Sequence, residues 1–353
     1  IAPRGAAGTG VAPTQGQFVR DLHECAIVAS RKIPGMSDIL HLLIPYAACS
    51  SPGSQQALQG LQLAHLDRLI ARLVPLEGDV GDDETLSAPH ERALARALGL
   101  PGGAGRIPWA AWHLHQQGRA QEAAHSAWAF VTPCHWQVRT DHVTLDDPAE
   151  LGLSEEASRA LLAIMAPWFA GDGITLHYDQ PTRWLAQGEL LADLPTASPE
   201  RVLRRDVSHW LPGSHKTHPL QRLHSEMQML LYTHPFNDER EAAHQRPVNA
   251  FWLHGAGRLD HTPAPTGPAP VVEAGLQEAA LREDWAAWAS AWQALDTGAL
   301  ARLDAHVARG GAAQLTLCGD RSTLAWHTAP RTVGQRIQRF FRPQRFTDVR
   351  EQL

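Results

Sequence analysis

The clearest pattern of apolar and polar positions lies between residues 219 and 258. Its first half carries apolar side chains at three- and four-residue spacing, namely Leu220, Leu223, Met227 and Leu230. That spacing predicts an amphipathic helix over residues 219–233. Pro235 predicts the end of this helix, because proline lacks an N–H and disfavours α geometry in the residue before it.

The second half of the same stretch predicts a loop and then a strand. Residues 237–245 are polar and charged, and residues 247–253 form an apolar run that leads into a Gly-x-Gly sequence. Glycines at such a point let a backbone approach a ligand closely. Four polar side chains gather there as candidate ligand-binding residues: Asn237, Arg240, Asn249 and His254. The alternative is that they cap and satisfy their own helix–loop–strand unit.

The rest of the chain alternates strand-like runs with helical patterns, which predicts an α/β fold. Apolar runs over residues 39–45 and 314–318 suit the buried strands of a mainly parallel sheet. Residues 128–145 are also strand-like, and a turn at 179–181 predicts a hairpin over residues 173–186. Helical patterns cover residues 56–73, 89–99, 109–117, 154–169, 277–292 and 297–307.

The order of these patterns predicts the domain organisation. Residues 1–35 are rich in glycine, alanine and proline, and we expect a disordered or non-native extension there. Residues 36–120 and 248–330 predict an α/β core. Residues 121–247 predict an inserted α+β subdomain, because strands precede and follow a helix. Residues 331–353 form a basic C-terminal tail.

Composition narrows the classes of function. The 353 residues are 44% hydrophobic and 19% charged, which is ordinary for a soluble globular protein. A net charge of −6 argues against nucleic acid or an anionic membrane as the partner. The four cysteines lie far apart and no apolar run is long enough to span a membrane, so we expect a cytoplasmic protein.

The tail leaves two alternatives open. Its interleaved arginines and phenylalanines could dock RNA or an acidic partner. The alternative is a solvated helix that packs its aromatic side chains on the body of the protein. We favour the second, because the net charge of the chain is negative.

Twenty histidines raise the question of a metal site. A catalytic zinc needs three nitrogen or oxygen ligands and one open position. Two candidate pairs join an aspartate to a histidine, Asp141 to His142 and Asp260 to His261. Neither pair has a recognised ligand spacing on one element, such as H-E-x-x-H. We therefore predict no metal site and keep both pairs as alternatives.

The stretch after the predicted 219–233 helix also carries a family resemblance. The pattern H-P-F-N-x-x-R from His234, followed by P-V-N-A-F-W-L-x-G-x-G from Pro247, resembles archaeal-type cofactor-independent phosphoglycerate mutases of the alkaline phosphatase superfamily. Residues 314–323 resemble another segment of that family, and the chain also resembles proteobacterial regulatory proteins of the RpfE type. The resemblance implies an alkaline-phosphatase-like core in which two divalent ions (Mn, Zn or Mg) activate a serine or threonine nucleophile.

Four positions depart from the pattern of the family. Its first strand ends in an Asp-Gly-x-Gly-Asp-like loop, where this sequence has Ile-Pro-Tyr-Ala-Ala after residue 43. The place of the nucleophile is taken by Pro-His-Glu at 89–91, and tryptophan and arginine replace two metal-binding histidines. The resemblance gives Ser87 and His90 as catalytic candidates, and Asp284, Asp320 and Arg321 as ligand-binding candidates. Without a metal, Arg321 could pair with Asp320 or bind a phosphate or carboxylate through its two-pronged guanidinium.

Three hypotheses follow. The first is a phosphoglycerate-mutase-like protein that has lost two-metal catalysis, needs no cofactor and binds a phosphorylated metabolite or a protein partner in regulation. The second is an active mutase or metal-dependent phosphoesterase whose rearranged ligands are Asp141, His142, His254, Asp260 and His261. The third is a partner-binding module that uses the tail, so that deletion of residues 331–353 abolishes partner binding and leaves the fold intact.

Convergence of Asp320, Arg321, Asp284, Ser87 and the end of the 39–45 strand on one pocket would indicate a vestigial site.

By analogy with the family, the stretch from 220 to 258 joins two lobes. Asn237, Arg240 and Asn249 are then expected to form its internal hydrogen-bond scaffold.

Overall fold

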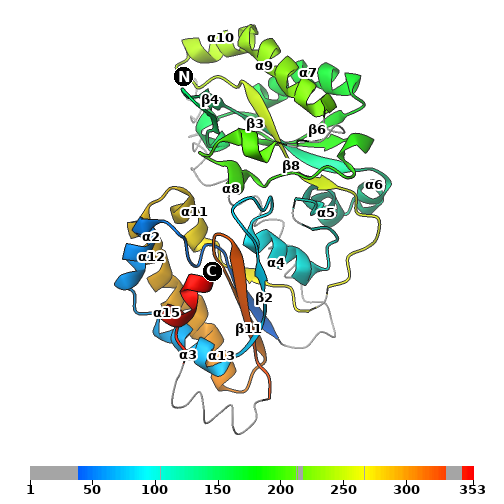
Figure 1. Ribbon diagram of the computed structural model, residues 1–353. Helices are drawn as coiled ribbons and strands as arrows, with labels where there is room; N and C mark the ends of the chain where they lie inside the picture. Colours follow the sequence, from blue (N-terminus) through cyan, green and yellow to red (C-terminus); the bar gives the residue numbers. More distant parts are fainter. Residues whose placement is uncertain (1–38, 104, 212, 214–217, 266, 331–343) are drawn as a thin grey trace, which may run out of the picture.

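The computed structural model describes residues 39–103, 105–211, 213, 218–265, 267–330 and 344–353. These residues form two lobes, each built on its own β-sheet (Figure 1). The sheet of the core lobe has the strand order β2-β11-β10-β1-β9, and the sheet of the insert lobe has the order β6-β7-β3-β8. The extension predicted for residues 1–35 lies outside the described residues. No helix in the described ranges is long and apolar enough to cross a membrane.

The sheet of the core lobe is mixed, whereas the sequence predicted a mainly parallel one. Its strands are β1 (Leu40–Ile44), β2 (Val74–Val80), β9 (Val271–Val272), β10 (Ala313–Cys318) and β11 (Ser322–His327). The pairs β1–β10 and β1–β9 are parallel, and the pairs β10–β11 and β11–β2 are antiparallel. The cause is the three-residue connection after β10, which is too short for a crossover and folds β11 back as a hairpin.

Helices cover both faces of this sheet. Successive residues of β1 point to opposite faces, so its apolar side chains pack against helices on both sides. Leu42 and Ile44 belong to one apolar cluster and Leu43 to another. The first cluster holds α2 (Pro52–Gln59), α3 (Ala64–Arg72), α11 (Gly275–Leu281), α12 (Trp285–Leu295) and α13 (Ala301–Ala308). The second holds α4 (Pro89–Leu98) and α5 (Trp109–Gln116), followed along the chain by α6 (Ala120–His125). The helices predicted at 56–73 and 277–292 are each two helices, the first divided at Gly60.

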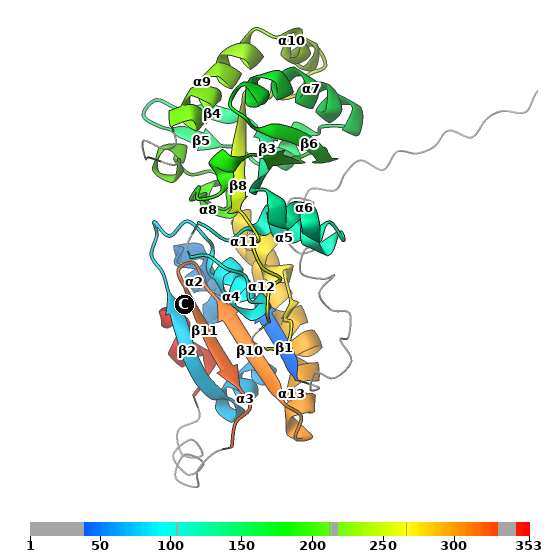
Figure 2. The ribbon, with the colours of Figure 1, turned by 90° about the vertical axis from the view of Figure 1, so that its right-hand side faces the viewer.

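The sheet of the insert lobe is antiparallel throughout, and Figure 2 shows it above the core sheet. Its strands are β3 (Trp128–Cys134), β6 (Thr175–Gln180), β7 (Arg183–Gln187) and β8 (Ala250–Gly257), beside a separate hairpin of β4 (Trp136–Val138) and β5 (Val143–Leu145). The predicted 173–186 hairpin is confirmed, as is α7 (Glu155–Gly171) with Ser154 at its N-cap. The predicted boundary at 248 placed β8 in the core, but β8 pairs with β3 and lies in the insert sheet.

The helix predicted at 219–233 is confirmed as α9 (His218–Tyr232). The loop predicted at 237–245 is wrong, because α10 (Pro235–Ala242) begins there with His234 at its N-cap. Proline both ends one helix and starts the next, since a residue in the first turn needs no N–H partner. The strand does not stop before its glycines either. Instead β8 continues through Gly255, whose φ of 61° accompanies a register shift against β3.

The described end of the basic tail is part of the core lobe. Phe346 begins α15 (Phe346–Val349), packs 5.4 Å from the ring of Trp292 and donates its backbone N–H to Asp67 Oδ1 at 2.8 Å. Deletion of residues 331–353 would therefore remove core side chains, which contradicts the expectation that the fold stays intact. Most of the predicted tail, residues 331–343, lies outside the described residues.

One buried carboxylate supports the start of α3 from a distant part of the chain. The N-cap of α3, Leu63, has no side-chain acceptor, and Asp296 accepts hydrogen bonds from the backbone of Leu66 (2.9 Å) and His65 (3.3 Å) instead. Asp296 lies in a π-helical turn (Asp296–Leu300) between α12 and α13. The turn therefore caps a helix more than two hundred residues earlier in the chain.

Replacement of Asp296 by alanine is expected to lower the free energy of unfolding by about 1–3 kcal/mol, because buried N–H groups lose their acceptor. Urea denaturation followed by circular dichroism measures the change. The exposed neighbour Thr297 provides the control, and Thr297→Ala should stay within about 0.5 kcal/mol. Equal changes in the free energy of unfolding for the two substitutions would show that Asp296 does not cap α3.

Candidate functional site

A carboxylate from the insert lobe is buried against the core lobe. Glu200 lies in α8 (Pro199–Val202), which sits at the junction of the two lobes (Figure 1). Tyr46 Oη donates to its Oε2 at 3.0 Å, and Gln277 Nε2 donates to its Oε1 at 2.6 Å. His90 Nε2 lies 3.4 Å from Oε2. Side chains from the end of β1, from α4 and from α11 thus hold one insert carboxylate. We call these residues, with Glu91, the Glu200 cluster.

Two titratable groups in the Glu200 cluster are perturbed by burial and by Glu200. Burial acts to lower the pKa of His90, but the charge and hydrogen bond of Glu200 outweigh it and raise that pKa. Burial, followed by the charge of Glu200, raises the pKa of Glu91 to about 7. Glu91 also accepts from the backbone of Ala88 at 2.9 Å and so caps α4. The cluster therefore holds a proton near neutral pH.

The backbone of Tyr46 is fixed in a strained conformation. Its φ of 54° lies in the left-handed region, which an aromatic residue rarely adopts. Trp288 Nε1 donates to the carbonyl of Tyr46 at 3.0 Å. Trp288 is the tryptophan that stands where the family resemblance places a metal-binding histidine. Its indole therefore supports the strained turn after β1 and offers no lone pair to a metal.

The neighbouring residue, Arg201, ties α8 to the core loops. Its side chain is buried and donates to the carbonyls of Thr85 (3.0 Å) and Asp320 (3.0 Å), and to those of Asp82 and Asp83. Burial lowers the pKa of its guanidinium. Buried charges persist where hydrogen bonds surround them. Glu200 and Arg201 together fix α8 against the edge of the core sheet where β1 and β10 end.

An open cavity of about 560 Å³ lies at the same edge and is called the Arg321 cavity. It is lined by residues that follow β1 and β10 and by the described end of the chain, among them Cys49, Ser50, Gln55, Asp320, Arg321 and Arg350. Ser50 donates to Asp320 Oδ2 from its backbone at 2.6 Å and from its hydroxyl at 2.8 Å. Arg321 Nε donates to Asp83 Oδ1 at 2.8 Å. Asp320 and Arg321 therefore lie together at this cavity with the segment after β1, whereas the end of the 39–45 strand is not among its lining residues.

The other two residues whose convergence would indicate a vestigial site do not line the Arg321 cavity. Ser87 is buried, and its hydroxyl accepts from the backbone of Gly105 at 2.8 Å. Asp284 caps α12 by accepting from the backbone of Ala287 at 2.9 Å. Both side chains accept hydrogen bonds from backbone N–H groups of the protein. The catalytic candidate His90 instead lies in the Glu200 cluster.

The three polar residues of the 220–258 stretch bond to backbone groups. Asn237 bridges Leu231 and Val248, and Asn249 receives the N–H of Trp136 and donates to its carbonyl. Arg240 donates to the carbonyls of Arg246 and Leu151. Buried polar groups satisfied in this way act as a scaffold, which agrees with the alternative interpretation of the sequence.

The residues that the second hypothesis names as rearranged metal ligands lie in separate parts of the structure. His254 is buried beside Thr132 Oγ1 (3.3 Å), and burial lowers its pKa to about 3. His142 contacts Asp141 at 2.6 Å in the exposed turn between β4 and β5. Asp260 lies 3.9 Å from Arg258 Nε, and its neighbour His261 is exposed. Across the described ranges, no three histidine, cysteine, aspartate or glutamate side chains are grouped to hold a metal ion.

The carboxylates at the edge of the core sheet do not fit a two-metal centre either. Asp320 is bonded to Ser50, and Glu200 is bonded to Tyr46 and Gln277. Two divalent ions would need these oxygens as ligands. The donor set that the family resemblance implies is therefore not assembled from the described residues.

Sequence reasoning did not find Tyr46, Glu200, Arg201 or Gln277. Their contacts join residues far apart, with a sequence separation of 154 for Tyr46 and Glu200 and of 77 for Glu200 and Gln277. A Glu-Arg pair after a proline in a polar segment resembles an ordinary exposed helix start. The local sequence pattern therefore gives no sign that Glu200 and Arg201 are buried.

Comparison with known proteins finds only distant similarity to solved structures. No family model matches the chain, and no curated protein matches it by sequence. The cofactor-independent phosphoglycerate mutase from Thermoplasma acidophilum DSM 1728 aligns with 12% identity and a TM-score of 0.32, over 82% of this chain and 90% of that one. The PH0037 protein from Pyrococcus horikoshii aligns with 11% identity and a TM-score of 0.38, over 83% and 88%. At these values the likeness is distant and establishes no activity.

Protonation of Glu91 is expected to make stability fall as the pH rises. Its pKa is raised from 4.5 to about 7, so the folded state binds more protons than the unfolded state within that window. Its contribution is fully present below pH 4.5 and is lost as the pH approaches 7. Urea denaturation of Glu91→Gln between pH 4.5 and 7 should show a shallower fall than the unsubstituted protein.

The exposed carboxylate Glu239 provides the control, and Glu239→Gln should leave the pH profile unchanged. The raised pKa of His90 leaves a residual fall above pH 6.5 in both proteins. If the pH profiles of stability of Glu91→Gln and the unsubstituted protein coincide, the pKa of Glu91 is not raised in the folded state.

Proposed function

We propose that this protein binds a phosphorylated metabolite in the Arg321 cavity and has lost two-metal phosphoryl transfer. The observation that carries the proposal is the guanidinium of Arg321. Within the described ranges, its Nε bonds to Asp83 and its two terminal nitrogens have no protein partner. A guanidinium presents paired N–H groups in the geometry of a phosphate or carboxylate, which favours binding of such an anion.

The surroundings of Arg321 support a small anionic ligand. Arg350 adds a second positive charge to the lining, Glu351 adds a carboxylate, and Ser50, Gln55 and Gln59 add neutral polar groups. Two hydrogen bonds from Ser50 stabilise the negative charge of Asp320 and partly offset its repulsion of an anion. A volume of about 560 Å³ lies within the usual range of small-molecule sites. The place also agrees with the general position of ligands in α/β proteins, beyond the carboxyl ends of parallel strands.

Loss of two-metal catalysis is supported by the bonds of the neighbouring side chains. Asp320 and Glu200 give their oxygens to protein donors, and the turn after β1 carries Tyr46 where the family resemblance requires carboxylates. An arginine beside Asp320 places a fixed positive charge where a cation would sit. A protein with this arrangement recognises a phosphoryl group by hydrogen bonds and charge alone.

Replacement of Arg321 by glutamine should weaken binding of 3-phosphoglycerate, used as the probe, by about 10- to 100-fold, because a charged hydrogen bond is lost. Isothermal titration calorimetry at pH 7.5 measures the dissociation constant. The control is Arg282→Gln, which removes an exposed arginine at the C-cap of α11 that pairs with Glu278 and lies outside the cavity. Binding that both variants weaken equally, or that neither variant weakens, would exclude this site.

A further inference from the structure

The segment formed by residues 350–353 makes one wall of the Arg321 cavity. Its four residues, Arg350, Glu351, Gln352 and Leu353, all line that cavity. The first three form a short 3₁₀ helix (Arg350–Gln352) that directly follows α15. In Figure 2 the C mark lies at the edge of the core sheet that faces the insert lobe. A segment from the far end of the chain therefore reaches the same edge as Arg321.

The backbone of Leu353 is bonded to the turn that carries Arg321. Its carbonyl oxygen accepts from the N–H of Ser322 at 3.2 Å and from the N–H of Arg321 at 3.4 Å. We call these two hydrogen bonds the Leu353 contact. Gly319 lies in the same turn, and a Cβ at that position would be 2.3 Å from the Leu353 oxygen. The contact therefore depends on the absence of a side chain at residue 319.

The 350–353 segment is also held at its other end. Phe346 and Val349 of α15 are buried in the core lobe. Leu353 N donates to the carbonyl of Arg350 at 3.2 Å, which closes the short helix between the two attachment points. The backbone of Arg350 is thus fixed on both sides. A side chain on a fixed backbone loses less conformational freedom when a ligand binds than one on a free segment.

The guanidinium of Arg350 is half-buried and makes no hydrogen bond or ion pair with another described residue. It lines the same cavity as Arg321, whose terminal nitrogens are also unpaired among the described residues. An anion in the cavity is then within the lining of two guanidinium groups, and each offers several N–H donors in one plane.

We propose that Arg350 is a second anion-binding residue of the Arg321 cavity and that the Leu353 contact positions it. The inference rests on the proposed function, because it concerns the same ligand. It adds a binding residue from the C-terminal segment and makes Gly319 and Leu353 positioning residues.

The first test removes the guanidinium of Arg350. Arg350→Gln should weaken binding of 3-phosphoglycerate about five- to tenfold in isothermal titration calorimetry at pH 7.5, because a charged hydrogen bond is lost. The control is Arg345→Gln, which removes the same charge from an exposed residue at the N-cap of α15 outside the cavity lining. Unchanged binding by Arg350→Gln, or equal weakening by both variants, would overturn the proposal.

The second test breaks the Leu353 contact without changing any charge. In Gly319→Ala the new methyl group should displace Leu353, and binding of 3-phosphoglycerate should weaken about five- to tenfold because Arg350 is no longer positioned. Gly275→Ala is the control, because a Cβ at this exposed residue of α11 meets no described atom within 4 Å. Circular dichroism checks that both variants fold.

The double variant Gly319→Ala/Arg350→Gln separates positioning from a general structural effect. Its binding should be less than about twofold weaker than that of either single variant, because two changes that act on one interaction are not additive. Losses that multiply would show that Arg350 acts without the Leu353 contact and would overturn its positioning. Stronger binding by Gly319→Ala would show that the 350–353 segment obstructs the cavity and would also overturn the proposal.

The proposal and the proposed function fail in different ways. If Arg321→Gln weakens binding and Arg350→Gln does not, the Arg321 cavity remains the site and only the role of Arg350 is excluded. If Arg321→Gln leaves binding unchanged, the site itself is excluded.

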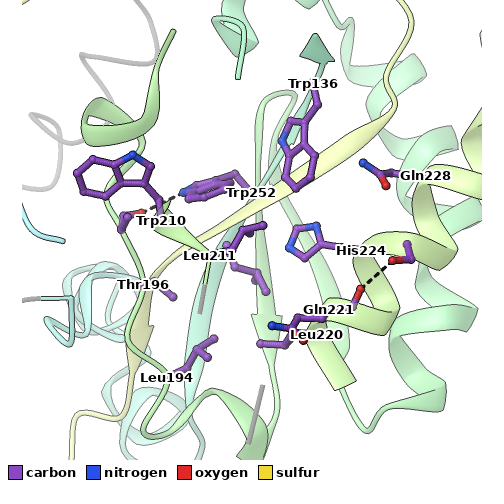
Figure 3. A pocket seen from close by; sticks show the side chains of 13 residues that line it. Trp136, Leu194, Thr196, Trp210, Leu211, Leu220, Gln221, His224, Gln228 and Trp252 are labelled. Atoms are coloured by element: carbon purple, nitrogen blue, oxygen red, sulfur yellow. Dashed lines mark hydrogen bonds between the residues drawn. The ribbon is translucent and has the colours of Figure 1, made fainter. Parts of the chain in front are cut away.

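A second cavity provides a check on where the probe binds. It has a volume of about 260 Å³, lies in the insert lobe between α9 and β8, and is lined by Trp136, His224 and Trp252 among others (Figure 3). It shares no lining residue with the Arg321 cavity, and neither Gly319 nor Arg350 lines it. Changes in binding that follow these two substitutions are therefore assigned to the Arg321 cavity.

Discussion

The buried carboxylate of Glu200 is the constraint on which the junction of the two lobes depends. A carboxylate removed from water is unfavourable unless hydrogen bonds and an opposite charge replace its hydration. Tyr46 and Gln277 supply the hydrogen bonds, and His90 supplies a nitrogen whose pKa is raised by the contact. These partners come from three segments of the core lobe. All three must be placed correctly before Glu200 is satisfied, so the cluster sets the position of α8 against the core sheet.

The same constraint shapes what the edge of the core sheet can do. Parallel strands place ligands beyond their carboxyl ends, and here α8 fills part of that space with Glu200 and Arg201. The space left open is the Arg321 cavity, whose walls carry two arginines, the carboxylates of Asp320 and Glu351, and hydroxyl and amide groups. Under the proposed function, this partly closed edge recognises a small anion and assembles no metal centre.

The sequence predicted the elements whose signals are local. Ser154 predicted the start of α7, and the turn at 179–181 predicted the β6–β7 hairpin. The mixed character of the core sheet was missed, because β11 (Ser322–His327) does not alternate regularly between apolar and polar residues. α10 was missed because Pro235 was interpreted as a stop, although it is also a favourable first residue of a helix.

The candidate site was predicted in part for the same physical reason. Asp320 and Arg321 follow a buried strand, and their place at the edge of the sheet could be inferred from that strand alone. Glu200 and Gln277 could not be inferred, because their role arises from tertiary contacts between distant segments. Ser87 and Asp284 had the appropriate residue types, but their side chains bond to nearby backbone groups.

The most direct test is anomalous diffraction from crystals grown with manganese chloride and 3-phosphoglycerate at neutral pH. We expect density for the phosphoryl group against the terminal nitrogens of Arg321, with Glu200 still bonded to Tyr46 and Gln277 and no anomalous peak on His90, Glu91 or Asp320. Two manganese ions held by Glu200, Glu91 or Asp320 and bridged by the phosphoryl group would contradict the account.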